Sequence, residues 1–183
     1  MTQNLLFMEE PYRARWSPSL WVISSLGTAT CLGVASLQLG RLGRATGPWA
    51  PWIALGVVML LLGSALFTVR SYAFEGSTLL IDRLFWTTRL PLDGLLSACV
   101  EEKAMRGSIR TCGNGGLFSF TGWYWSSRLG HYRAFVTDGR RPVVLRLPKR
   151  TVVISPERPE EFVHEATALI GIANPAALAH SYS

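Results

Sequence analysis

Two long stretches of the chain contain no charged residue, whereas charges are spread throughout the remainder. One runs from Ser17 to Gly40 and the other from Gly47 to Val69. A helix needs about 20 apolar residues to cross the hydrocarbon core of a bilayer. The pattern therefore predicts two transmembrane helices, at residues 20–39 and 49–69. Because a short, glycine-containing connection separates them, we expect the two helices to form a hairpin.

Small side chains recur along the first of these spans. Ser25, Ala29 and Gly33 are four residues apart and fall on one stripe of a helix. A stripe of this kind allows another helix to approach closely. We therefore predict a helix–helix contact at these three residues, with the second span as the natural partner.

A cleaved signal peptide or a soluble helical core fits the uncharged stretches less well. A signal peptide has an apolar region of about 7–15 residues that ends at a small-residue cleavage site. The first stretch is longer, and no convincing site of that kind follows it. Helices that are apolar all round can also belong to a soluble core, but they then need a much larger protein to cover them.

Arginines near the two spans predict the orientation of the hairpin. More of them lie on the side of both termini than in the connection. Those on the terminal side are Arg13, Arg15, Arg70 and Arg83, and those in the connection are Arg41 and Arg44. The positive-inside rule then places both termini in the cytoplasm. Residues 1–19 are expected to form an N-terminal cytoplasmic segment.

After Arg70 the pattern changes to short apolar runs with turn residues between them, which is typical of an antiparallel β domain. The predicted strands are Ser71–Phe74, Thr78–Arg83, Phe85–Leu90, Leu95–Glu102, Tyr132–Thr137, Pro142–Leu147 and Thr151–Ile154. Asp138-Gly139 suits a tight turn, so we expect the two strands beside it to form a hairpin.

A C-terminal helix is predicted after the last strand. Pro159-Glu160-Glu161 is typical of a helix start, with acidic residues in the first turn. The apolar residues that follow fall on one helical face, and we expect this face to cover an open end of the sheet. They are Phe162, Ala166, Leu169 and Ile170.

A set of glycines and hydrophobic residues along the same region carries a resemblance. It comprises Tyr72, Leu90-Pro91-Leu92-Asp93, Arg110 with Gly113, Gly115 and Gly116, Gly122, Leu129-Gly130 before Tyr132, Phe135-Val136-Thr137 and Val153-Ile154-Ser155-Pro156. From about Tyr72 to Ile170 the chain resembles the bacterial pleckstrin-homology-like (PH-like) domains that follow one or two membrane helices.

This resemblance implies a fold and a location. The fold class is an α+β membrane protein, in which the two-helix transmembrane hairpin precedes a PH-like curled antiparallel β-sheet of about seven strands capped by a C-terminal α-helix. The PH-like domain would occupy residues 70–172, and residues 173–183 would be a flexible tail. The expected location is the bacterial inner membrane.

The region from Lys103 to Arg150 holds ten basic residues and the single acid Asp138, with aromatic residues between them. Near an anionic membrane surface each basic residue is worth about 1 kcal/mol. We predict a surface for anionic lipid headgroups or a protein partner, formed by Lys103, Arg106, Arg110, Arg128, Arg133, Arg140, Arg141, Trp123 and Trp125. The alternative is that the cations are merely solvated and the rings belong to the core, because half of the side chains of a strand face solvent.

The glycine-rich segment from Arg110 to Gly116 is the candidate for a second, narrower site. Its backbone amides can offer a nest to an anion. The glycine spacing does not fit a phosphate loop, however, and a flexible strand connection is the simpler interpretation. The loop Phe74–Ser77 lacks the basic residues that PH domains use for phosphoinositides, so no such lipid site is transferred.

No catalytic constellation is visible in the sequence. The three cysteines share no C-x-x-C spacing, and the three histidines lack metal-ligand spacing. We therefore predict a non-enzymatic binding or scaffolding module without cofactor or metal, and expect no nucleic-acid partner. The alternative is a structural subunit of a larger membrane complex, assembled through its transmembrane helices.

Overall fold

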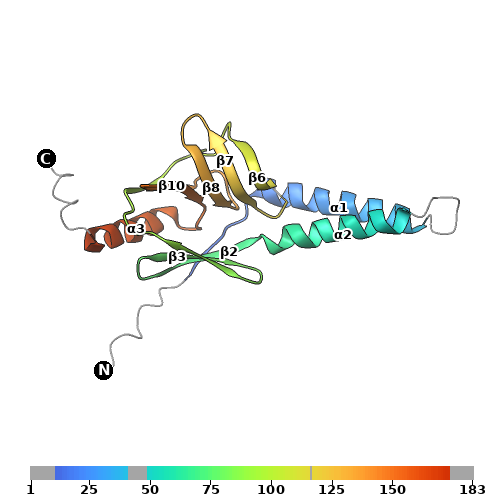
Figure 1. Cartoon of the computed structure of the whole chain (residues 1–183), viewed down its shortest axis with the longest axis horizontal. Helices are drawn as coiled ribbons and strands as arrows, with labels where there is room; N and C mark the ends of the chain where they lie inside the picture. The colour runs from blue at the N-terminus through green and yellow to red at the C-terminus, as the bar shows by residue number, and fades with distance from the viewer. Residues whose placement is uncertain (1–10, 41–48, 116, 174–183) are drawn as a thin grey trace, which may run out of the picture.

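The computed structural model describes residues 11–40, 49–115 and 117–173. Residues 1–10 of the predicted N-terminal segment, the connection between the helices and all but the first residue of the predicted tail lie outside this part of the chain. Two helices project from one end of a β domain, and a third helix lies at its opposite end (Figure 1).

The projecting helices are α1 (Pro18–Gly40) and α2 (Ala50–Leu66). They lie side by side, α1 leading away from the β domain and α2 returning to it (Figure 1). The predicted end of the second span is wrong, because the helix stops at Leu66 and Val69 already begins a strand, where it is fully buried.

Length and composition distinguish the two helices. In the described residues, α1 contains a 21-residue apolar segment, Pro18–Gln38, which is long enough to cross a membrane. Helix α2 is apolar but has only 17 residues. The structure therefore contains one clear membrane-span candidate and a shorter apolar helix packed along it.

The contact between these helices does not use the predicted stripe of α1. Ala35 and Ala54 are buried, whereas Ser25, Ala29 and Gly33 are all exposed. A Cβ atom added at Gly33 would meet nothing within 4 Å. The prediction that the second helix packs on these small residues is therefore wrong.

The attachment of α1 to the β domain explains why the stripe of Ser25, Ala29 and Gly33 faces away from α2. Ser24 is only 3% exposed, and its Oγ accepts a hydrogen bond from the backbone N–H of Phe118 at 2.9 Å. Because Ser24 faces inward, its neighbour Ser25 lies about 100° further round the helix. The stripe that begins at Ser25 is thereby turned away from α2.

Ten strands in the described residues form two sheets. The four-stranded sheet has the order β1-β2-β3-β4, with β1 (Tyr12–Arg13), β2 (Val69–Glu75), β3 (Thr78–Arg83) and β4 (Thr87–Pro91). The six-stranded sheet has the order β5-β9-β10-β8-β7-β6, with β5 (Ser97–Val100), β6 (Ile109–Gly115), β7 (Phe120–Ser126), β8 (Gly130–Val136), β9 (Val143–Leu147) and β10 (Arg150–Ile154). The expectation of one curled sheet with about seven strands is thus wrong in its count, since β1, β6 and β7 were not predicted.

The predicted hairpin between β8 and β9 is also wrong. Strand β10 lies between them, parallel to β8 and antiparallel to β9. Gly139 does not adopt the positive φ that a tight hairpin turn needs. The turn after Leu147 forms the hairpin instead, so the sheet is not antiparallel throughout.

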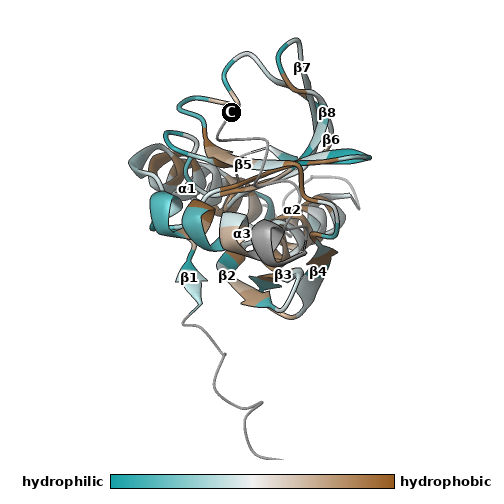
Figure 2. Cartoon of the chain, turned by 90° about the vertical axis from the view of Figure 1, so that its left-hand side faces the viewer, coloured by the Kyte–Doolittle hydropathy of each residue, from teal (hydrophilic) through white to brown (hydrophobic). Residues whose placement is uncertain are grey.

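Helix α3 (Pro159–Ala173) closes the gap between the two sheets at the end far from α1 and α2. Figure 2 shows it between the four-stranded sheet and the six-stranded one. Phe162 and Ala166 are fully buried, which confirms the predicted covering face; the side chains of Leu169 and Ile170 lie outside the described part. The Phe162 ring packs on Phe74 and on Tyr12, with centroid distances of 4.7 and 5.3 Å.

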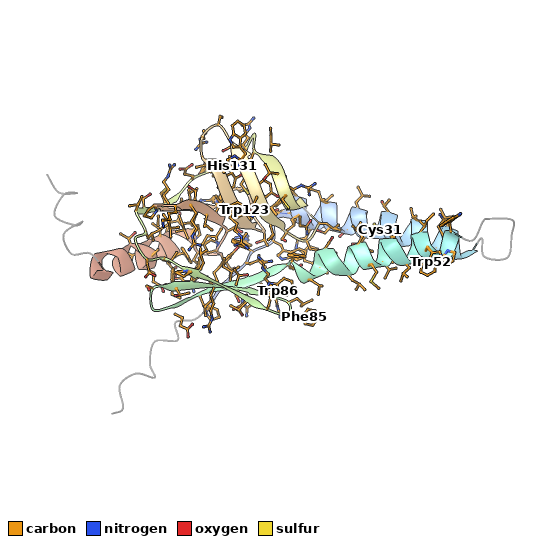
Figure 3. The ribbon with its side chains drawn as sticks, in the orientation of Figure 1. Cys31, Trp52, Phe85, Trp86, Trp123 and His131 are labelled. Atoms are coloured by element: carbon orange, nitrogen blue, oxygen red, sulfur yellow. The ribbon has the colours of Figure 1, made fainter. Side chains whose placement is uncertain are left out.

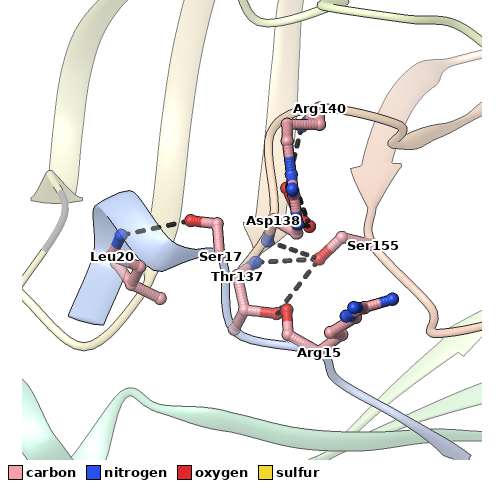
Figure 4. Close-up of polar contacts among 7 residues, drawn as sticks. All are labelled: Arg15, Ser17, Leu20, Thr137, Asp138, Arg140 and Ser155. Atoms are coloured by element: carbon pink, nitrogen blue, oxygen red, sulfur yellow. Dashed lines mark hydrogen bonds and ion pairs between the residues drawn. The ribbon is translucent and has the colours of Figure 1, made fainter.

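The segment before α1 is bound into the β domain, which the sequence analysis did not predict. Strand β1 pairs with β2. Thr137 then donates its Oγ1 hydrogen to the carbonyl of Arg15 at 2.9 Å and accepts the N–H of Ser17 at 3.2 Å. Ser155 Oγ accepts the N–H groups of Thr137 and Asp138 beside this joint (Figure 4).

Tyr72 links the two sheets from within the core. It is fully buried in β2, and its hydroxyl donates to the carbonyl of Phe135 in β8 at 2.6 Å. The same oxygen accepts the N–H of Ser155 at 3.3 Å. Burial raises the pKa of Tyr72 to about 12, so the neutral, donating form prevails over the physiological range.

Replacing Tyr72 by Phe should lower the free energy of unfolding by about 1–3 kcal/mol, because a buried carbonyl and a buried N–H lose their partner. Thermal unfolding of the full chain in detergent measures this loss. Tyr132→Phe is the control: its hydroxyl donates to the half-buried Ser108, which can turn to water instead, so the loss should be smaller. Equal losses for the two variants would contradict the role of the Tyr72 hydroxyl in linking the two sheets.

The stabilisation by Tyr72 should also depend on pH. In the folded chain the pKa lies near 12, above the value of about 10 for an exposed tyrosine. The stabilisation is therefore complete below pH 10 and is lost as the pH rises towards 12. The difference in stability between the wild-type chain and Tyr72→Phe should narrow over this interval.

Candidate anion-binding site

The nine residues predicted to form one basic, aromatic surface are divided among separate places. Three arginines are neutralised by acids on the surface. Arg128 pairs with Glu101 at 2.7 Å and Arg140 with Asp138 at 2.6 Å. Arg141 pairs with Glu160. These ion pairs reduce the charge that the three arginines offer to a ligand, although Glu101 is shared with Arg146 at 3.4 Å.

Two further cations lie beside a cavity of about 480 Å³. Lys103 and Arg106 line it together with Phe120 and Tyr124. Both cations are exposed. Trp125 belongs to neither group: it is 41% exposed and pairs with His131. Figure 3 shows His131 on the part of the β domain that points away from the helices.

Arg110, Arg133 and Trp123 meet at a third place, a cavity of about 600 Å³ between α2 and the six-stranded sheet. Strands β6, β7 and β8 supply these three residues. Helix α2 supplies the apolar wall on the other side, through Met59 and Leu60 among others. We call this space the junction cavity.

A third arginine lines the junction cavity from the other sheet. Arg83, the last residue of β3, is 7% exposed. Its guanidinium carbon lies 5.1 Å from the centre of the Phe135 ring and 5.6 Å from that of Phe67. Among the described residues, its Nε is buried and has no hydrogen-bond partner. A buried cationic group in this state is costly unless something else satisfies it.

The three arginines together give the junction cavity a positive potential. Burial, together with the charge of Arg133, lowers the pKa of Arg83 to about 10. Burial also lowers the pKa of Arg133, whose guanidinium packs 4.8 Å from the Phe135 ring centre. None of the described residues that line the junction cavity is acidic. The cavity therefore concentrates positive charge without an internal counterion.

Two glycines let the paired strands β6 and β7 approach each other closely at the wall of the junction cavity. Gly113 and Gly122 are paired and have φ angles of +115° and +144°. A Cβ atom on Gly122 would come within 2.8 Å of the Gly113 Cα. Larger residues at either position would separate the strands and fill part of the cavity.

Arg110 is held over these glycines. Its Nη1 donates to the carbonyl of Gly113 at 3.1 Å. From the sequence, the segment from Arg110 to Gly116 was a candidate backbone nest for an anion. Its residues 110–115 belong to β6 and pair with β7, whereas Gly116 lies outside the described residues. The described part therefore contributes to the cavity through the arginine rather than through free amides.

Arg83 was not among the site residues predicted from the sequence. The alternation in β3 contains the signal, because Leu79 and Ile81 are fully buried and Arg83 continues the same inward face. Phe85 was predicted to be part of a strand, whereas the strand begins at Thr87. Phe85 is 74% exposed, and with Trp86 it lies at the domain end of α2 (Figure 3).

The comparisons with known proteins agree with this architecture. The family model described as a bacterial PH domain matches residues 70–170, which is more than half of the chain. The chain belongs to the bacterial PH domain family. No curated protein and no solved structure matches the chain. The family membership confirms the resemblance seen in the sequence and covers strands β2 to β10 with most of α3.

Replacing Gly122 by Ala should lower the free energy of unfolding by about 1–3 kcal/mol, because its φ is open to few residues other than glycine and the added Cβ meets the backbone of Gly113. Gly139→Ala is the matched control: its φ is ordinary and an added Cβ meets nothing within 4 Å. We expect the control to change stability by less than about 0.5 kcal/mol. Thermal unfolding in detergent tests both variants, and comparable losses would refute the role of Gly122.

Proposed function

We propose that this bacterial PH domain protein is a membrane-anchored, non-enzymatic binding module. In this proposal α1 and α2 form a transmembrane hairpin, and the β domain lies against the cytoplasmic surface of the inner membrane. There it presents its basic, aromatic residues to anionic headgroups or to a protein partner at the membrane.

The exposure of large apolar side chains on both helices is the observation that supports the anchoring. Leu26 and Leu37 of α1 are 67% and 62% exposed, and Leu60 of α2 is 61% exposed. Burial of an apolar side chain of this size is worth about 1.5–3 kcal/mol. Helices that leave so many of them uncovered are stable in hydrocarbon rather than in water.

The shortness of α2 is compatible with a transmembrane role. Its 17 residues span about 26 Å at 1.5 Å per residue, close to the thickness of a hydrocarbon core. Trp49 precedes the helix and Phe67 follows it, and both rings are exposed. Aromatic rings prefer the headgroup level, and a bilayer thins locally around a short helix at modest cost.

The membrane-facing end of the β domain follows from the way α1 and α2 join it. Phe85 and Trp86 lie beside the end of α2 (Figure 3), where exposed rings suit the interface. Arg13 and Arg15 lie in the segment before α1, on the same side of the hairpin. By the positive-inside rule, this side is cytoplasmic.

In the described residues, no three His, Cys, Asp or Glu side chains are placed to hold a metal ion together. The PH family is a family of binding modules, and the cavities described above contain arginines and aromatic rings rather than a nucleophile beside a base. Membership of this family supports a binding role.

Labelling of Cys112 tests the topology. Cys112 is exposed on β6, whereas Cys31 and Cys99 are half-buried. Burial and the neighbouring Glu101 raise the pKa of Cys99, which slows its reaction. A membrane-impermeant maleimide should therefore label the chain in inside-out vesicles and not in intact spheroplasts.

Cys112→Ser is the control for this experiment and should abolish most of the labelling. The chain should also stay with the membrane after washing with alkaline carbonate. Labelling of intact spheroplasts would show that the β domain lies outside the cytoplasm. Release of the chain into the carbonate supernatant would refute the transmembrane anchor.

A structural role within a larger membrane complex is the second candidate function. The exposure of Ser25, Ala29 and Gly33 favours it, because α2 leaves this stripe free for the helix of another protein. Gly33→Leu should then reduce copurification of a partner from native membranes severalfold. Val34→Leu, an exposed position off the stripe, should leave it unchanged. The same set of partners with both variants would argue against this role.

A further inference from the structure

We propose that the junction cavity binds one anionic phospholipid, with its phosphate held between Arg83, Arg110 and Arg133 and its acyl chains lying against α2. The inference rests on the proposed membrane anchoring and assigns a ligand class to one site of the domain. It concerns a different place from the loop between β2 and β3, where Glu75 pairs with Arg89.

The cavity has an apolar wall and a cationic wall. Along α2 towards the β domain, the apolar residues come before the arginines, as a lipid requires. Met59 and Leu60 of α2 line it and are 55% and 61% exposed. Gly63 and Ser64 line it one turn closer to the β domain. A lipid that follows α2 out of the hydrocarbon therefore passes apolar side chains first and reaches the arginines at the headgroup level.

Arg83 supplies the strongest reason to expect an anion. It is more than nine-tenths buried, lines the cavity, and has an unpaired Nε. The three aromatic rings around it satisfy its charge only partly, at distances of 5.1–5.6 Å. A phosphate oxygen accepts hydrogen bonds from guanidinium groups in a geometry that neither a ring nor a backbone carbonyl offers.

The neighbouring groups complete a site for the rest of the headgroup. Arg133 lies opposite Trp123, with its guanidinium carbon 5.9 Å from the centre of that ring. Arg110 approaches from β6 and keeps donors free besides the one that bonds Gly113. Asn114 and Thr121 add polar side chains to the same wall.

The charge of the cavity indicates which phospholipids fit best. Three arginines line the space, and none of its described lining residues is acidic. A phosphate in a diester carries one negative charge, whereas a phosphate monoester carries about 1.5 to 2 at neutral pH. We therefore expect phosphatidic acid to bind more tightly than phosphatidylglycerol, and both to bind more tightly than the zwitterionic phosphatidylcholine.

Lipid titration of the full chain in mild detergent, followed by native mass spectrometry, tests the proposal. The wild-type chain should retain one molecule of phosphatidic acid or phosphatidylglycerol. Arg83→Met and Arg133→Gln should each weaken this binding by about tenfold or more, because charge-assisted hydrogen bonds are lost. Met keeps an apolar side chain of similar length against Phe67 and Phe135, and thermal unfolding shows whether each variant is folded.

Arg128→Gln is the matched control. It changes the net charge by the same amount, but Arg128 pairs with Glu101 on the surface and does not line the cavity. Its lipid binding should stay within about twofold of the wild type, since surface ion pairs contribute little. Equal weakening in all three variants would show diffuse attraction to anionic membranes and would overturn the site.

Two further outcomes would also overturn the proposal. If phosphatidylcholine is retained as well as the anionic lipids, the cavity recognises acyl chains and not phosphate. If inorganic phosphate at equal concentration displaces the lipid, the cavity is a site for a free phosphate ion. Each of these results leaves the membrane anchor intact, whereas loss of the anchor is detected separately by the carbonate wash.

Discussion

The rest of the structure depends on the attachment of the helical pair to the β domain at two points, the start of α1 and the end of α2. On one side, Thr137 holds Arg15 and Ser17 just before α1. On the other, β2 follows α2 after a gap of two residues, and the carbonyl of Phe67 in that gap accepts the hydroxyl of Ser119 at 3.1 Å. The domain cannot rotate freely on such a double attachment. The same face is therefore always turned towards the helices.

This fixed orientation creates the junction cavity. A domain on a flexible linker would present all of its basic residues equally to a membrane. Here Arg83, Arg110 and Arg133 stay beside α2, while Arg128 lies in the β7–β8 turn between Ser126 and Gly130. Position relative to the helices, rather than the number of basic residues, separates the arginines that line the junction cavity from those that pair with acids.

The sequence predicted much of the fold and only part of the candidate site. Alternation and turn residues located β2 to β4 and β8 to β10 within a few residues, since these strands bury one face. Strands β6 and β7 were missed because their glycines are typical of a loop, although Gly113 and Gly122 permit a close approach of the two paired strands. Arg110, Arg133 and Trp123, which were predicted to belong to one basic surface, line the junction cavity, whereas the other members of that surface lie elsewhere. Arg83 was overlooked because its burial depends on the second sheet packing over it.

The sequence by itself determined the uncharged spans, the family and the alternation of buried positions, because each depends on residues close together in the chain. Only the tertiary structure decided that β10 lies between β8 and β9, that β1 joins the sheet, and which stripe of α1 faces α2. These features depend on hydrogen bonds and packing between residues far apart in the chain, as between Arg15 and Thr137. No local pattern encodes such a pairing, because many strand orders bury the same alternating faces equally well.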